Sequence, residues 1–149
     1  MEAESTPTKI LAAHECWSLL RDSPFGRLAF CVQGEPDILP INFVVDHGSI
    51  VFRTSEGTKS RSSERAAVAF EADGFLGDGT RVWSVVVKGQ ASTINQTPEL
   101  MRTVHLPLHP WEAGRKDRYM RLVPETISGR SFAPVPTSPY LQAVEAHDE

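Results

Sequence analysis

The stretch from Ile38 to Arg61 constrains the fold most, because it holds two apolar runs separated by a very short polar connection. Both runs, residues 38–45 and 50–54, are rich in the β-branched and aromatic residues that favour strands. The connection Asp46-His-Gly-Ser49 contains a glycine, which can take the positive φ of a tight hairpin turn. The sequence therefore predicts a β-hairpin followed by a polar loop.

The first strand of this hairpin is expected to be covered on both faces. Ile41, Phe43 and Val45 lie on one side of an extended chain, whereas Asn42 and Val44 lie on the other. Apolar side chains on both sides indicate a strand with neither face fully open to water.

Further strand-like runs follow along the chain, with only short helical segments between them. Strands are expected at 27–32, 67–72 and 82–94, and the runs 119–123 and 126–132 are expected to form one final strand or a pair of strands. Short helices are expected at 16–20 and from 97 to 107. Gly89, inside the longest run, predicts a β-bulge or bend. About six strands, joined mostly by tight turns and without a strand–helix–strand rhythm, indicate a small antiparallel β-barrel.

Size and charge narrow the class of protein. The chain has 149 residues, enough for one domain with a sizeable core. A net charge of -4 argues against duplex nucleic acid or an anionic membrane as the main partner, and no apolar run is long enough for a membrane-spanning helix. We expect a flexible N-terminus over residues 1–12, one domain over 13–132, and a proline-rich and then acidic tail over 133–149.

The two cysteines indicate the redox state of the compartment in which the protein is expected to fold. Cys16 and Cys31 lie in apolar surroundings, without a C-x-x-C pair or a histidine at metal-ligand spacing. Both are expected to be buried free thiols in a reducing environment. The first ten residues hold no apolar signal-like region, so a cytoplasmic protein is expected.

The end of the hairpin and the loop after it carry a group of residues suited to binding an anion. Arg53 offers a guanidinium, Thr54 a hydroxyl, Lys59 a point charge, and Gly57 a permissive backbone. The spacing is not that of a Walker phosphate loop. From residue types alone, a solvated basic turn with no ligand is the favoured interpretation.

No metal ligand or catalytic residue is predicted. His105 and His109 have a spacing of four, but Pro107 between them would break the helix that a zinc pair needs. No Ser-His-Asp or Cys-His set can be assembled from spacing.

Several motifs in a fixed order give the chain a resemblance to a known family. They are Leu39-Pro-Ile-Asn42, Phe52-Arg-Thr54, Gly57-Thr-Lys59, Val68-Ala-Phe-Glu71, Trp83 to Ala91, Pro110-Trp111 and Ile127-Ser-Gly-Arg130. Over roughly residues 17–132 the chain resembles the pyridoxamine 5'-phosphate oxidase-like flavin-binding split-barrel superfamily, and most closely its small flavin-nucleotide-binding branch. The resemblance implies a mainly β, six-stranded antiparallel split β-barrel of Greek-key type with short peripheral helices. It also implies a homodimer with two FMN sites at the subunit interface.

The resemblance also assigns the cofactor-binding residues. It places Arg53, Thr54 and Lys59, with Gly57 and Thr58 in the same loop, at the flavin phosphate and ribityl chain. It places Pro40, Ile41 and Asn42 at the isoalloxazine edge. Trp83 and Ser84 would approach the flavin from the other subunit, and Trp111 would cover the dimethylbenzene edge. On residue type alone Trp83 could equally belong to the core, and Trp111 could be a dimer anchor.

The function that the resemblance implies is a flavin-dependent oxidoreductase, in which FMN performs the electron transfer. Two alternatives stay open: a module that binds or stores flavin or haem without turnover, and a reductase that uses the deazaflavin coenzyme. Vitamin B6 oxidation is not expected, because the chain after Phe132 lacks a basic and aromatic substrate-binding extension. The substrate, a small molecule, is not predicted.

Overall fold

A computed structural model describes residues 8–54, 66–94, 102–103, 106 and 118–134 of the chain. Its one long helix, α1, covers Ala13–Arg21. The strands are β1 (Lys9–Ile10), β2 (Phe25–Val32), β3 (Glu35–Asp46), β4 (Ser49–Thr54), β5 (Ala66–Leu76), β6 (Arg81–Thr93) and β7 (Arg118–Phe132). The helix predicted from Thr97 lies largely outside the described residues.

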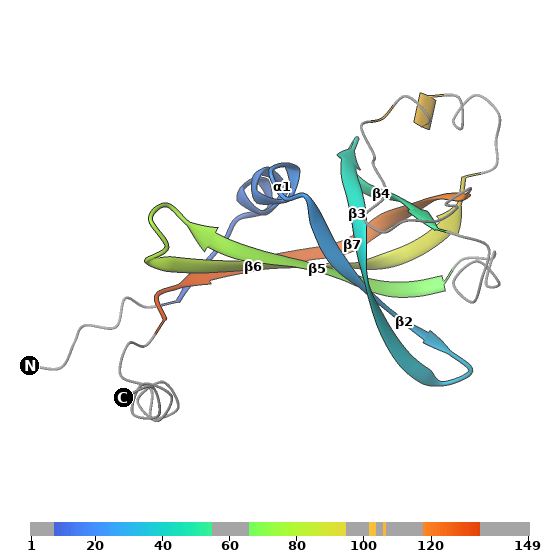
Figure 1. The fold of residues 1–149 in the computed structure, drawn as a ribbon, viewed down its shortest axis with the longest axis horizontal. Helices are drawn as coiled ribbons and strands as arrows, with labels where there is room; N and C mark the ends of the chain where they lie inside the picture. The colour runs from blue at the N-terminus through green and yellow to red at the C-terminus, as the bar shows by residue number, and fades with distance from the viewer. Residues whose placement is uncertain (1–7, 55–65, 95–101, 104–105, 107–117, 135–149) are drawn as a thin grey trace, which may run out of the picture.

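Six of the strands form a closed antiparallel ring in the order β7-β4-β3-β2-β5-β6, because β6 pairs in turn with β7. The long strands β5, β6 and β7 run across the molecule, while β3 and β4 cross them steeply (Figure 1). This ring confirms the predicted six-stranded split barrel. The short β1 adds to the outside of β7, and its two residues lie in the segment for which a flexible N-terminus is expected.

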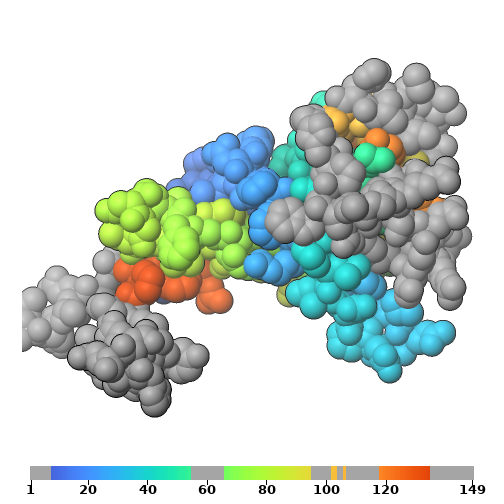
Figure 2. Space-filling view, viewed as in Figure 1, coloured from blue at the N-terminus to red at the C-terminus, as the bar shows by residue number. Residues whose placement is uncertain are grey.

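The predicted β3–β4 hairpin is confirmed. Its turn is made by His47 and Gly48, both with positive φ, and Val45 pairs with Ile50. A second tight turn of the same kind, at Gln33 and Gly34, joins β2 to β3. The structure begins β3 at Glu35, before the predicted Ile38, so the β2–β3 arm is longer than expected and projects from the body of the molecule (Figure 2).

Strand β3 changes its partner part of the way along. Residues 35–42 pair with β2, and residues 43–46 pair with β4. Within the described residues, one edge of β3 therefore has no strand partner up to Asn42. Both faces are partly covered as predicted, because Ile41 and Phe43 enter the core and Asn42 and Val44 are half-buried.

The predicted irregularity at Gly89 is confirmed by a register shift between Lys88 and Gly89. A Cβ atom at Gly89 would lie 2.0 Å from the carbonyl oxygen of Val123, so only glycine allows the two strands to approach here. On the other side of the shift, β7 continues through Pro124 as one strand of 15 residues. The two runs predicted at 119–123 and 126–132 are thus parts of a single strand.

The core fills the ring and extends beneath α1. Cys16 and Leu20 are fully buried on the inner face of the helix, and a Cβ at Gly129 would lie 2.6 Å from the Cys16 sulfur. Gly129 therefore lets α1 pack directly on β7. The prediction of buried free thiols is correct for Cys16 but wrong for Cys31, which is exposed because it lies on the projecting β2–β3 arm.

Candidate functional site

The end of β4 presents its side chains to two different environments. Phe52 belongs to the barrel core, while Val51 belongs to a second cluster on the opposite face together with Ile94. Because side chains alternate along a strand, Thr54 lies on the core side and Arg53 on the outer side. Thr54 is fully buried, and Arg53 is half-buried.

Arg53 is held over an aromatic ring. In the β4–β7 ladder it lies opposite Tyr119, and its guanidinium carbon is 5.2 Å from the centre of that ring. Such cation–π stacking orients the guanidinium. The predicted anion-binding arginine is thus a positioned side chain at the end of a strand.

The open edge of β3 lies beside β4, because Phe43 and Phe52 form the last pair between the two strands. The N–H of Ile38 donates to the side chain of Asp37 at 2.8 Å and so does not point toward β2. By strand alternation, the backbone groups of Pro40 and Asn42 face the same open edge. Proline fits there because it has no N–H to leave unpaired. This edge offers the carbonyls of Pro40 and Asn42 and the N–H of Asn42.

Two buried side-chain oxygens near this edge have no hydrogen-bond partner among the described residues. Asn42 donates its Nδ2 to the carbonyl of Pro24 at 3.2 Å, which leaves Oδ1 unpaired. The Oγ1 of Thr54 is also unpaired. Since buried polar atoms are almost always paired in native proteins, these two oxygens mark places where a ligand or water is expected. Ile41 has its side chain in the core, and by the same alternation its backbone groups face β2, so it anchors the edge without facing it.

A charged cluster fixes the β3–β4 hairpin turn, at the other end of β4 from Arg53. The Nη1 of Arg121 lies 3.0 Å from the Oδ2 of Asp46 and 2.6 Å from the Oγ of Ser49. The Ser49 hydroxyl also donates to the Asp46 carbonyl. Arg121 therefore ties β7 to the β3–β4 turn and holds β4 in place.

A second charged cluster spans β2 and β5. Arg27, which pairs with Pro40 across the β2–β3 ladder, contacts Glu71 at 2.7 Å and Asp73 at 3.2 Å. Burial and the neighbouring Asp73 carboxyl raise the pKa of Glu71 to about 7, although Arg27 opposes this shift. Glu71 can thus change its charge near neutral pH.

The structure does not bring Trp83 and Ser84 to Arg53 within one chain. Trp83 lies near the start of β6 and is 5% exposed, inside the barrel core. Thr93 at the other end of β6 is the residue that neighbours the Arg53 end of β7, and the two positions are about 33 Å apart along the strand. Only a second copy of the chain could bring Trp83 to this site.

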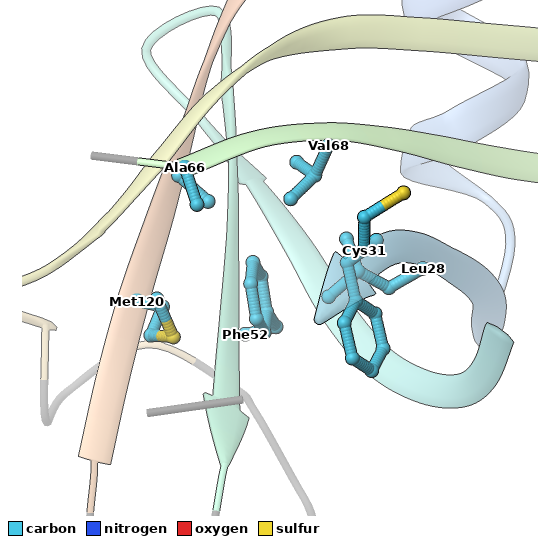
Figure 3. Close-up of a pocket in the computed structure, with 8 residues that line it drawn as sticks. Leu28, Cys31, Phe52, Ala66, Val68 and Met120 are labelled. Carbon is cyan, nitrogen blue, oxygen red and sulfur yellow. The ribbon is translucent and has the colours of Figure 1, made fainter. Parts of the chain in front are cut away.

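The remaining site predictions, for Gly57, Thr58, Lys59 and Trp111, fall outside the described residues. A pocket in the barrel interior near Phe52 is not an alternative flavin site. It is apolar, is lined by Phe52, Ala66 and Met120 among others, and has a free volume of about 20 Å³ (Figure 3). That is room for about one water molecule, far less than a flavin ring needs.

Tyr119 belongs to the site, and Arg121 supports β4, although the sequence did not point to either residue. Both lie on β7, more than 60 residues from Arg53, so only the β4–β7 pairing brings them to β4. The alternation of Tyr119, Arg121 and Val123 with the core residues Met120 and Leu122 was the available signal, since it predicts a shared outer face.

A closed six-stranded ring with an open strand edge beside Arg53 defines a split-barrel protein, and that edge is its candidate anion-binding site. Residues 12–131 match the sequence profile of pyridoxamine 5'-phosphate oxidase. The chain belongs to the pyridoxamine 5'-phosphate oxidase family.

Individual relatives agree with this assignment. An FAD-binding protein from Mycobacterium smegmatis is 38% identical, with 85% of this chain and 99% of that chain covered and a TM-score of 0.72. A candidate pyridoxamine 5'-phosphate oxidase from Corynebacterium glutamicum is 37% identical, with 86% and 100% covered and a TM-score of 0.77. An uncharacterised protein of Mycobacterium tuberculosis is 36% identical over 107 residues, which are 69% of this chain and 94% of that protein. The family thus includes flavin-binding relatives of similar length.

Two further observations concern the described part of the chain. None of its helices is long and apolar enough to cross a membrane. Nor do its histidine, cysteine, aspartate and glutamate side chains form a group of three that could hold a metal ion.

Proposed function

We propose that the protein is an FMN-dependent oxidoreductase of the cytoplasm that binds its flavin between two copies of the chain. The observation that carries the proposal is the open edge of β3 at Pro40 and Asn42, which lies beside Arg53 and Thr54. An FAD-binding relative at 38% identity supports it.

The residues present fit a flavin. The ring needs donors and acceptors for its pyrimidine edge, and the exposed backbone groups of Pro40 and Asn42 supply both. The unpaired Oδ1 of Asn42 can accept from a ring N–H or a ribityl hydroxyl, and the unpaired hydroxyl of Thr54 can donate to a phosphate oxygen. Arg53, with Lys59 and the backbone of Gly57 and Thr58, would neutralise the phosphate.

When bound, the flavin would supply hydride or electron transfer, and the protein would supply position and shielding. The β3 edge would orient the ring, because Ile41 and Phe43 anchor that strand in the core. Tyr119 would keep the Arg53 guanidinium aimed at the phosphate. No side chain is assigned as a catalytic acid or base.

Flavin titration tests the proposal. The purified protein is expected to be yellow or to take up FMN with one site per chain. Arg53→Ala and Lys59→Ala should each weaken FMN binding about tenfold or more, since a charge-assisted hydrogen bond is lost. Lys88→Ala, which removes an exposed cation from the middle of β6, is the matched control and should bind normally. A colourless protein that takes up no added flavin would refute the proposal.

The choice of flavin is tested in parallel. The M. smegmatis relative is described as binding FAD, so FAD is the second candidate, and the deazaflavin coenzyme is the third. Competition of the three ligands for one site decides among them. Steady-state reduction of the bound flavin by nicotinamide donors then separates an oxidoreductase from a protein that only binds or stores the cofactor.

The proposed dimer would complete the site. Trp83 and Ser84, which lie far from Arg53 in one chain, would reach the flavin from the partner, and Trp111 would cover the ring. Ile38 and Phe75 are 58% and 72% exposed and give the outer surface apolar groups that a partner could bury. Light scattering should therefore report twice the mass of one chain, and a monomer at all concentrations would contradict the dimer.

A further inference from the structure

Within one chain, a second pocket lies away from Arg53 and Pro40 and is lined by residues of α1 and of the end of the β5–β6 hairpin. Its volume is about 440 Å³, within the range of small-molecule sites. Strands β1, β5, β6 and β7 and helix α1 all contribute to its lining, which includes none of the residues assigned to the flavin.

One side of the pocket is apolar. Leu11, Leu19 and Leu76 line it from three different segments of the chain. Leu11 is fixed by its backbone, whose N–H donates to the carbonyl of Gly129 at 2.9 Å. These leucines form a surface on which a hydrocarbon chain or ring can be removed from water.

The other side of the pocket holds a positioned guanidinium. Arg81, at the first residue of β6, donates from Nη2 to the Oγ of Ser131 at 3.0 Å. Ser131 is itself 2% exposed, so this bond holds the half-buried arginine in place. Arginine has five N–H donors, and among the described residues no carboxylate forms an ion pair with Arg81.

The other charges lining the pocket do not cancel this guanidinium. Lys9 and Glu15 form an ion pair with each other at 3.2 Å. The Glu15 carboxylate also accepts the N–H of Ala12 at the start of α1. His14 lies on the same rim and adds no negative charge. The pocket therefore has a net positive charge next to an apolar wall.

We propose that this pocket binds a small amphiphilic carboxylate, with the carboxylate on Arg81 and the apolar body against Leu11, Leu19 and Leu76. A planar guanidinium pairs with a carboxylate through two parallel hydrogen bonds, and the leucines accept the hydrocarbon. Within one chain this site lies apart from Arg53 and Pro40, on the end of β6 that also holds Trp83 and Ser84, and carboxylate binding here does not require the flavin.

Octanoate is the probe for this site, and octan-1-ol is its uncharged counterpart. Titration of the full-length protein should give one saturable octanoate site by calorimetry. Amide shifts in a ¹H–¹⁵N spectrum should concentrate at residues 9–19, 76–81 and 129–131. Octan-1-ol should bind about tenfold or more weakly, because it lacks the charge-assisted bonds to Arg81. No saturable binding, or shifts centred on residues 40–54, would overturn the proposal.

Variants test whether the ligand's carboxylate binds to Arg81. Arg81→Gln should weaken octanoate at least tenfold and leave flavin binding unchanged. Lys88→Gln removes a cation from the same strand outside the pocket and should leave octanoate binding unchanged. If Arg81→Gln does not fold, Leu76→Gln is used, and the same loss is expected. Equal octanoate affinity in wild type and the folded pocket variant would refute the site.

Discussion

The Thr54 side chain has a buried hydroxyl that a ligand could pair and that the ligand-free protein leaves unpaired in the described part of the chain. Its hydroxyl is fully buried and has no partner among the described residues. Thr54→Val, which removes only the hydroxyl, should stabilise the flavin-free protein by about 1–3 kcal/mol. The same change should weaken flavin binding several-fold. Urea unfolding and flavin titration measure the two effects.

The opposite signs of these effects make the Thr54 test decisive. Thr93 is half-buried, and its Oγ1 is also buried and unpaired in the described structure. It lies near the Arg53 end of β7 but is not assigned to the flavin, so it is a control of similar location. Thr93→Val should raise stability without changing flavin affinity. If Thr54→Val also leaves flavin affinity unchanged, Thr54 does not contact the cofactor.

Glu71 should make stability depend on pH. Its pKa in the folded protein is raised to about 7, from an ordinary value of 4.5, chiefly by burial. Between these values the folded state binds more protons than the unfolded chain, so this group's contribution to stability falls as pH rises from about 4.5 through 7. Glu71→Gln should flatten that fall, and unfolding curves at pH 5 and pH 8 measure it.

The control for Glu71 is an exposed carboxyl elsewhere on the same sheet. Glu35→Gln, at the exposed start of β3, should keep the wild-type pH dependence. If the stability of Glu71→Gln still decreases with rising pH as much as that of the wild type, groups other than Glu71 cause the decrease.

At the residue scale, the sequence predicted the chemistry of the site better than its geometry. Arg53 and Thr54 stand out by residue type, but alternation alone does not tell which faces the core. Tyr119 and Arg121 could not be assigned, because a long-range strand pairing brings them to β4. Residue type also left Trp83 open between cofactor and core, and within one chain it lies in the core.

Among the contacts between elements, that of β6 with β7 at Gly89 leaves the least room for a side chain. A Cβ there would overlap the Val123 carbonyl, which belongs to the backbone and cannot rotate away. Gly89→Ala should therefore cost about 1–3 kcal/mol or more. Thermal or urea unfolding measures this loss. Lys88→Ala, at the exposed neighbouring position, should change stability by less than about 0.5 kcal/mol.

Local patterns predicted elements well where turns and apolar runs coincide. The β3–β4 hairpin and the Gly89 irregularity follow from short-range backbone chemistry. The strand expected at 67–72 was too short, because β5 covers Ala66–Leu76 and only a short turn remains before β6. Asp73 and Gly74 are residue types typical of a loop, but pairing with β6 keeps them extended. Long-range strand pairing of this kind is not part of a residue's local strand propensity.

For the whole molecule, a site completed by two copies predicts that flavin affinity depends on protein concentration. Dilution below the dimer dissociation constant should release flavin, because monomers would lack the groups supplied by the partner. Fluorescence of released flavin, measured over a dilution series at fixed excess ligand, reports this. Affinity that stays constant into the monomeric range would show that one chain forms the complete site.

From residue patterns alone, the antiparallel barrel could be predicted as a fold class, but its strand pairing could not. Six strands and tight turns indicate an antiparallel barrel, but nothing local determines that β7 pairs with both β4 and β6. Those two ladders close the ring, and both join segments far apart in the chain. The motif order and its family resemblance supplied what residue physics could not.

The change of partner along β3 has a consequence for amide hydrogen exchange. Alternate N–H groups of a strand point to opposite edges, and β3 is bonded through one edge up to Asn42 and through the other from Phe43 onward. Slowly exchanging amides should therefore fall on every second residue, and the pattern should change phase at Asn42 and Phe43. The unprotected amide of Asn42 would then slow when a ligand occupies that edge, so exchange at this one position reports whether the site is filled.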